Sequence, residues 1–230
     1  WQLPSAARLK KPSPVLEITG SMRVVTKVES DSPTASSGTP LALEYYYAQA
    51  RTHASGRGYL GFEQIKTREP LSGVETTTTY RQDWPYIGYP LKTEVKKSNG
   101  SLLSRSVNTW SLKGWQSSWQ SMVEADGTAA LDAVQPYIKQ AVEESFDLNS
   151  GAAVQTVTTD NVYDNYGNPT SIKVTTVGAG SGLSAGKYQK ETTHAYLAPG
   201  LAADYSQERG RLSSTTVVSR RDDDNDGSYE

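Results

Sequence analysis

The sequence contains no cysteine. This absence excludes a disulfide framework, a thiolate zinc site and a cysteine nucleophile. No apolar run reaches the roughly 18 residues that a transmembrane helix needs, and no signal peptide is recognisable. The chain begins at Trp1 without a methionine and stops at Glu230 in an expected loop, so we expect a fragment of a longer protein.

Charge of one sign is not in excess, since 23 Lys and Arg face 25 Asp and Glu for a net charge of -2. This balance gives no case for nucleic acid or an anionic membrane as a partner. The histidines are His53 and His194, and no G-x-S-x-G frame accompanies them, so a Ser-His-Asp site is not indicated. A two-carboxylate glycosidase stays open because its pair need not be close in the chain, but nothing selects such a pair. We predict that the chain is not an enzyme.

Apolar residues are scarce, at 36% of the chain, and the mean hydropathy is -0.59. The aromatic residues are 14 Tyr and 5 Trp with only 2 Phe. This composition favours amphipathic sheet faces over a thick apolar core. The fold class we predict is all-β, built from antiparallel hairpins that form a large twisted sheet.

The stretch 56–90, GRGYLGFEQIKTREPLSGVETTTTYRQDWPYIGYP, predicts a hairpin. Residues 62–69 alternate in character, residues 74–81 are rich in β-branched side chains, and Pro-Leu-Ser-Gly at 70–73 supplies a turn. Two prolines after Tyr80 exclude a regular central strand there. We expect an ordered corner pinned by Trp84 and Tyr86.

Strand signals occur along the rest of the chain. The predicted strands are 15–30 with a break or bulge at Gly20, 41–50, 89–97, 102–112, 154–163, 170–177, 187–196 and 212–220. Asn99-Gly100 predicts the turn of the second hairpin. Residues 129–148 are ambiguous: a helix-like apolar stripe is interrupted by Pro136.

The order GRGYLGF, about twenty residues, then TTTYRQDWPYIGYP resembles the signature of bacterial Rhs/YD-repeat proteins. The resemblance is closest to the shell-forming B component of Tc-type insecticidal toxins and to related wall-associated proteins. Residues 162–169, VYDNYGNP, resemble the YD repeat, whose hallmark is YDxxGN. Asp164 can cap this turn, Gly167 supplies a positive φ, and Tyr163 should pack against the next hairpin. Residues 210–212 resemble the family's GRL corner, although Gln207 and Glu208 replace the usual tryptophan and aliphatic residue.

The resemblance also organises the chain. Residues 1–40 would be an irregular lead-in with the first strand, 41–150 the GRGxLGF-containing sheet region, and 151–230 the start of the YD-repeat hairpins with an acidic C-terminal loop. It favours a strand over a helix for residues 137–148.

In function, the resemblance implies a non-enzymatic segment of a β-shell that encapsulates a toxic C-terminal cargo. The partners would be other parts of the same long chain and toxin-complex subunits, and the location would be secreted or at the bacterial cell surface. Open strand edges should also make the isolated chain self-associate. The alternative is a cell-surface β-module that binds glycans or a protein through aromatic clusters. Its candidate residues are Tyr45, Tyr46, Tyr47, Trp110, Trp115 and Trp119.

The C-terminal run DDDNDG places Asp222, Asp224 and Asp226 before Gly227, as in the first half of a calcium loop. These carboxylates are candidate calcium ligands, and calcium is the single cofactor that the sequence suggests. The twelfth-position glutamate of an EF-hand does not occur before Glu230, and the preceding strand signal argues against an EF-hand helix. A solvated acidic turn is the alternative.

Overall fold

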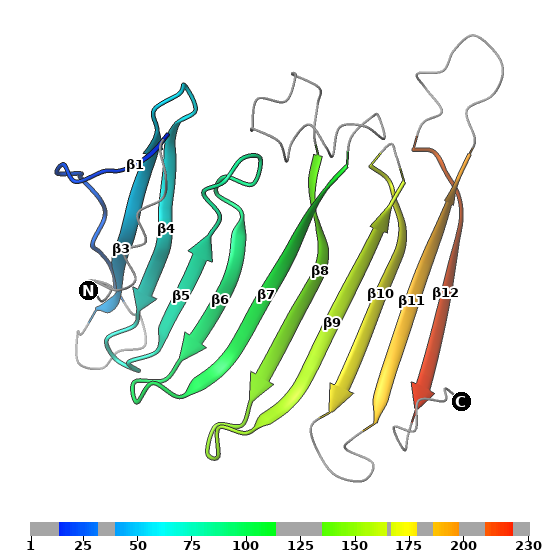
Figure 1. The fold of residues 1–230 in the computed structure, drawn as a ribbon. Helices are drawn as coiled ribbons and strands as arrows, with labels where there is room; N and C mark the ends of the chain where they lie inside the picture. Colours follow the sequence, from blue (N-terminus) through cyan, green and yellow to red (C-terminus); the bar gives the residue numbers. More distant parts are fainter. Residues whose placement is uncertain are drawn as a thin grey trace. The chain divides into compact units, whose positions relative to one another are not determined.

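The computed structural model describes residues 14–31, 40–113, 135–164, 167–178, 186–197 and 210–222 (Figure 1). All regular secondary structure in these ranges is β-strand, which confirms the predicted all-β class. Across the same ranges there is no apolar helix of the length needed to cross a membrane.

The strands agree in place with most of those predicted. They are β1 (Val15–Glu17), β2 (Lys27–Ser30), β3 (Leu41–His53), β4 (Gly58–Arg68), β5 (Glu75–Tyr80), β6 (Pro90–Lys96), β7 (Leu102–Lys113), β8 (Gln135–Phe146), β9 (Ala153–Tyr163), β10 (Pro169–Gly178), β11 (Lys187–Tyr196) and β12 (Leu212–Asp222). The ambiguous segment is therefore a strand from Gln135 to Phe146, and the helical interpretation is wrong there.

The hydrogen-bonded strand order is β1-β3-β4-β5-β6-β7-β8-β9-β10-β11-β12, and β2 pairs with β3 beside β1. From β3 onward each strand therefore follows its predecessor in the chain. The recorded registers are antiparallel, as hairpin connections require. Antiparallel hairpins in one sheet were the predicted architecture.

The chain divides into two compact units, which are described separately below. The first holds residues 1–106 and 148–151, and the second holds 107–147 and 152–230. The division of the sequence at residues 40 and 150 rests on motif content and stays a prediction.

The long strand predicted at 15–30 is wrong in its middle. β1 pairs with the end of β3 and β2 with its start, while residues 18–26 between them are not in a strand. Two backbone hydrogen bonds tie this connection to β3, from Ile18 N to Ala50 O (2.9 Å) and from Tyr45 N to Thr26 O (2.8 Å). The break thus covers more than the bulge expected at Gly20.

Burial is sparse in both units. Among the described residues the buried hydrophobic side chains are Ala50 and Leu60, whereas 18 large hydrophobic side chains are exposed. A thick core therefore contributes little to holding the strands in register. Strand ladders, turns and cross-strand pairs such as Lys66–Glu75 (3.0 Å) and Thr78–Thr93 (3.3 Å between hydroxyl oxygens) supply the specific contacts instead.

Candidate functional site: a buried polar cluster that joins the two motif halves

The GRGYLGF motif forms the end of the β3–β4 hairpin and contains a β-bulge. Arg51 pairs with Gly61 and Thr52 with Tyr59, so Leu60 is the extra residue in β4. Leu60 is 1% exposed, and Gly61 has φ of 83°. An L-residue rarely adopts this left-handed backbone, so the Leu-Gly pair of the motif is what this bulge needs.

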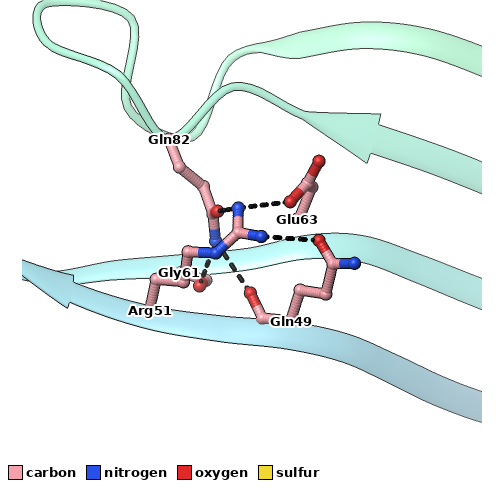
Figure 2. Close-up of polar contacts among 5 residues, drawn as sticks. All are labelled: Gln49, Arg51, Gly61, Glu63 and Gln82. Carbon is pink, nitrogen blue, oxygen red and sulfur yellow. Dashed lines mark hydrogen bonds and ion pairs between the residues drawn. The ribbon is translucent and has the colours of Figure 1, made fainter. Parts of the chain in front are cut away.

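Arg51 lies opposite the bulge and is 5% exposed. Its Nη1 donates to a carboxylate oxygen of Glu63 and to Oε1 of Gln82 (2.6 Å), and its Nη2 donates to Oε1 of Gln49 (2.9 Å), as Figure 2 shows. A buried guanidinium is tolerated only when it is paired and hydrogen-bonded. These three side chains meet that requirement.

Gln82 connects the cluster to the second half of the motif, TTTYRQDWP. Its Nε2 donates to the carbonyl oxygens of Gln49 and Gly61, both at 2.9 Å, while its Oε1 accepts from Arg51 (Figure 2). Both amide protons and the amide oxygen are therefore used, which suits a side chain that is 4% exposed. One glutamine thus holds β3, β4 and the corner after β5 together.

Gln49 adopts φ of 57°, which is the left-handed region and is uncommon for a residue other than glycine. Its carbonyl oxygen accepts from Gln82 and its side-chain oxygen accepts from Arg51. Such a conformation costs about 1–3 kcal/mol and persists only where neighbouring contacts enforce it. The polar cluster, defined as Gln49, Arg51, Glu63 and Gln82, supplies those contacts.

The corner after β5 is ordered, as predicted. Arg81 forms an ion pair with Asp83, and its guanidinium lies 3.7 Å from the ring centroid of Tyr86. Backbone bonds from Arg81 N to Tyr89 O and from Gly88 N to Arg81 O, both 2.9 Å, close the loop. Tyr86 is therefore a contact residue as expected.

Trp84, the other predicted anchor, is 46% exposed. The guanidinium of Arg57 lies 4.9 Å from its ring centroid, and the Trp84–Pro85 peptide bond is cis. The buried members of the corner are Gln82 and Pro85. Trp84 and Tyr86 thus identify the corner in the sequence, while the side-chain amide of Gln82 makes most of the corner's buried polar contacts.

In the second unit, the YD-like turn is built as its residue types predict. Asp164 accepts from the backbone N of Asn168 through Oδ1 and from Asn168 Nδ2 through Oδ2, both at 2.9 Å. Gly167 has φ of 83°, the positive value expected there. Asp164 therefore caps the turn and Gly167 permits it.

Tyr163 has an aromatic contact with the preceding strand. Its ring centroid lies 4.7 Å from that of Tyr137 on β8, while its expected packing against the next hairpin stays a prediction. The contact to the following part of the sheet is made by Tyr196 on β11, whose hydroxyl donates to Pro169 O at 2.8 Å. Tyrosines thus connect neighbouring hairpins on both sides of this turn.

The titratable groups with shifted pKa values sit within the strands. Burial raises the pKa of Tyr196, and the nearby Asp164 adds to this effect. Burial would also raise the pKa of Glu94, but its ion pairs with Lys92 and Lys96 outweigh burial and lower that pKa. Perturbed groups that mark active sites converge in one cleft. These groups have structural partners in separate strands.

The remaining candidate residues are placed as follows. The Nδ1 of His194 on β11 lies 3.0 Å from the hydroxyl of Thr215, and His53 closes β3 opposite Gly58. Asp222 is buried at the end of β12, whereas Asp224 and Asp226 lie outside the described residues. The described ranges bring no three potential metal ligands together, and the calcium site stays a prediction.

The aromatic clusters are partly described. Tyr45, Tyr46 and Tyr47 line a groove of about 450 Å³ in the first unit, together with Phe62, the end of β1 and residues of the 18–26 connection. Tyr47 donates its hydroxyl proton to Val25 O at 2.9 Å, and its ring is 4.7 Å from Phe62. Trp110 is half-buried on β7, while Trp115 and Trp119 lie outside the described residues.

No protein-family model and no curated protein matches the sequence. Solved structures do: the crystal structure of TcdB2-TccC3-Cdc42 aligns with a TM-score of 0.65 over 89% of this chain, and that of TcdB2-TccC3 with 0.60 over 88%, each at 10% identity. The fold of this chain is therefore similar to that of a part of these TcdB2-TccC3 structures. This Tc-toxin-like fold confirms the resemblance that the motifs predicted. The chain spans 13% of the length of each matched chain.

Sequence reasoning found the motif but missed the polar cluster. Gln82 is the glutamine of the Tyr-x-Gln-x-Trp-Pro pattern, but this pattern does not indicate which residues its side chain binds. Arg51 and Glu63 belong to no motif. The one available signal was Arg51 itself, between Ala50 and Thr52 in a strand. A cation buried in a sheet is expected to need a carboxylate on a neighbouring strand.

Proposed function

We propose that this chain is a wall segment of a Tc-toxin-like β-shell and that the shell encloses a toxic C-terminal polypeptide. The observation that carries the proposal is the use made of the motif residues. Gln82, Gly61, Asp164 and Asn168 all hold backbone turns or bulges in place. Residues with these contacts shape the sheet and do not position a reacting group. The proposed role is therefore non-enzymatic.

The proposed mechanism is steric. A continuous antiparallel sheet satisfies its own backbone hydrogen bonds and separates two solvent compartments without needing a thick core. Many modest ladder contacts, each broken only with its neighbours, make such a wall durable in time. Among the described hydrophobic residues, Ala50 and Leu60 alone are buried. Such sparse burial is consistent with a wall that faces solvent.

The partners we propose are other segments of the same long chain and further toxin-complex subunits, in a secreted or cell-surface protein. The matched crystal structures hold TcdB2-TccC3 with and without Cdc42. Similarity of fold to a small part of those chains supports assembly with neighbouring segments.

Protease protection tests the proposal in the natural protein that carries this chain. The C-terminal polypeptide should resist a broad-specificity protease in the wild type and be cleaved when the wall is breached by the double change Arg51→Ala and Gln82→Ala. Gln64→Ala, a half-buried glutamine of β4 outside the polar cluster, is the matched control and should keep the protection. Equal cleavage of the C-terminal polypeptide in the wild type and the breached variant would refute enclosure.

A binding module is the second candidate function, favoured by the groove beside β3. Its volume of about 450 Å³ is within the range of small-ligand sites, and aromatic rings contribute to its lining. Titration of the chain with a panel of oligosaccharides, followed by tyrosine and tryptophan fluorescence, tests it. Saturable binding that is lost in Tyr45→Ala would support this function, and the absence of binding across the panel would reject the glycan form of it.

A further inference from the structure

A row of polar side chains crosses the second unit from β8 to β12. Gln140 pairs in register with Asp160, Asp160 with Lys173, and Lys173 with Glu191, and Arg220 of β12 reaches Glu191. We call these five residues the polar ladder. Gln140 Nε2 donates to Asp160 Oδ1 at 2.8 Å, and Arg220 Nη1 lies 3.8 Å from Glu191 Oε2.

The sign of charge alternates along the ladder. From β9 to β12 it reads Asp160, Lys173, Glu191, Arg220, which is negative, positive, negative, positive. Asp160 lies directly opposite Lys173, and Lys173 directly opposite Glu191, where the Cβ atoms of antiparallel strands are about 4.5–5.5 Å apart. Arg220 lies opposite Gln189 and reaches Glu191 diagonally, at 3.8 Å. A two-residue slip would keep the faces but break this alternation, so the ladder selects the observed register.

The ladder stops at Arg220 within the described residues. Lys173 has a carboxylate on each side, whereas Arg220 has Glu191 and the Gln189 amide oxygen (3.2 Å) on the β11 side. Its side chain is 43% exposed. No described strand lies on the other side of β12. Lys173 has a carboxylate on both neighbouring strands, whereas in the described sheet Arg220 has one on the β11 side only.

The middle of β12 lacks the usual protection of a free edge. A register shift leaves Ser213 as an extra residue near its start, but from Ser214 to Ser219 the strand pairs regularly with β11, carries no charged residue and no proline, and is exposed. Proteins commonly block solvent-exposed edges with lysine, proline or bulges. The composition of β12 instead suits a strand that accepts a partner.

We propose that β12 pairs with a β-strand of another polypeptide segment that places a carboxylate beside Arg220 and so extends the polar ladder by one step. A second copy of β12 does not meet this requirement. Its one carboxylate is Asp222, and an antiparallel β12–β12 pair that set Asp222 opposite Arg220 would align residues 220–222 alone. The proposal concerns strand choice and does not depend on encapsulation.

Synthetic strands test the proposal on the whole 230-residue chain. Two fluorescent peptides of about ten residues, the length of a long strand, would alternate Thr and Val and carry Glu or Lys at the position opposite Arg220. We expect the Glu peptide to bind roughly two- to five-fold more tightly than the Lys peptide, as cross-strand charge pairs predict. Fluorescence anisotropy measures both affinities.

Charge reversal gives the decisive arm. Arg220→Glu should invert the preference, and Arg220→Gln should abolish it, while Ser219→Glu on the opposite face of the same strand should leave it unchanged. Circular dichroism verifies that each variant keeps its strands, and the Gln variant serves if the Glu variant unfolds. Equal affinities for the two peptides, a preference that Arg220→Glu leaves intact, or no binding of either peptide would each overturn the proposal.

Discussion

The side-chain Nε2 of Gln82 lies 2.9 Å from the carbonyl oxygen of Gly61, 21 residues earlier in the chain. This contact joins the two halves of the GRGYLGF…YRQDWP motif across the sheet. The same nitrogen bonds Gln49, and the amide oxygen bonds Arg51, so one side chain fixes a bulge, a left-handed residue and a buried cation. The motif is therefore a structural unit rather than two independent turns.

Gln82→Ala should destabilise the chain by about 2–4 kcal/mol, because it removes a hydrogen bond to a buried guanidinium and leaves the part-buried carbonyl oxygens of Gln49 and Gly61 without this donor. Urea unfolding followed by tryptophan fluorescence measures the change as a lower transition midpoint. Gln64→Ala on β4 is the matched control, and its cost should stay below about 1 kcal/mol. Similar midpoints for the two variants would show that the polar cluster does not hold the motif together.

Gly167→Ala should cost about 1–2 kcal/mol, because alanine disfavours the φ of 83° at this turn. An added Cβ would also lie 2.1 Å from Oε1 of Gln135, but that oxygen ends a flexible side chain and can move. Adding Gln135→Ala should therefore restore little of the lost stability. Gly20→Ala, which has open space and no positive φ, is the control and should change the urea midpoint only slightly. Full rescue by the second substitution would locate the cost in the clash instead of the backbone.

The turns could be predicted from sequence because their chemistry is local. Asp164, Gly167 and Asn168 close a turn among themselves, and Asn99-Gly100 supplies another, so no distant residue is needed to recognise them. Strands between such turns follow from β-branched and alternating residues. The spacing of the turns along the sequence is therefore enough to predict the antiparallel order of most of the strands.

The polar cluster and the 18–26 connection could not be predicted in this way, because both depend on contacts between distant residues. The left-handed conformation of Gln49 is enforced by Arg51 and Gln82, which no local pattern reveals. Residues 22–26 have strand-forming side chains, but a strand needs a partner edge. β3 binds β2 through residues 41–44 and β1 through 51–53, and the irregular Gln49 falls between these stretches.

Acid should weaken the chain partly through Glu94. The folded-state pKa of this carboxyl is lowered from 4.5 by Lys92 and Lys96 against the opposing effect of burial, so its contribution is fully present above about pH 4.5 and is lost as pH falls through the lower folded value. Glu94→Gln should therefore flatten the stability profile below pH 4.5, by no more than about 1 kcal/mol.

Urea midpoints measured from pH 6 down to the onset of acid unfolding give this profile. The double change Lys92→Met and Lys96→Met removes the same ion pairs and should flatten the acid limb in the same way. An unchanged slope in both variants would assign the acid sensitivity to other groups.

Self-association of the isolated chain should run through the free edge of β12. Val217 is 53% exposed in the uncharged part of this strand, where pairing with a further strand would cover it. A lysine on an edge strand opposes such pairing, because its charge would have to be buried or left close to another lysine. We therefore expect Val217→Lys to shift the chain toward the monomer in sedimentation velocity at high concentration, relative to the wild type. Val154→Lys changes a similarly exposed valine (50%) on the interior strand β9 and should leave the association of the wild type in place. If both lysines reduced association equally, general charge repulsion would explain the effect, and the edge would not be its route.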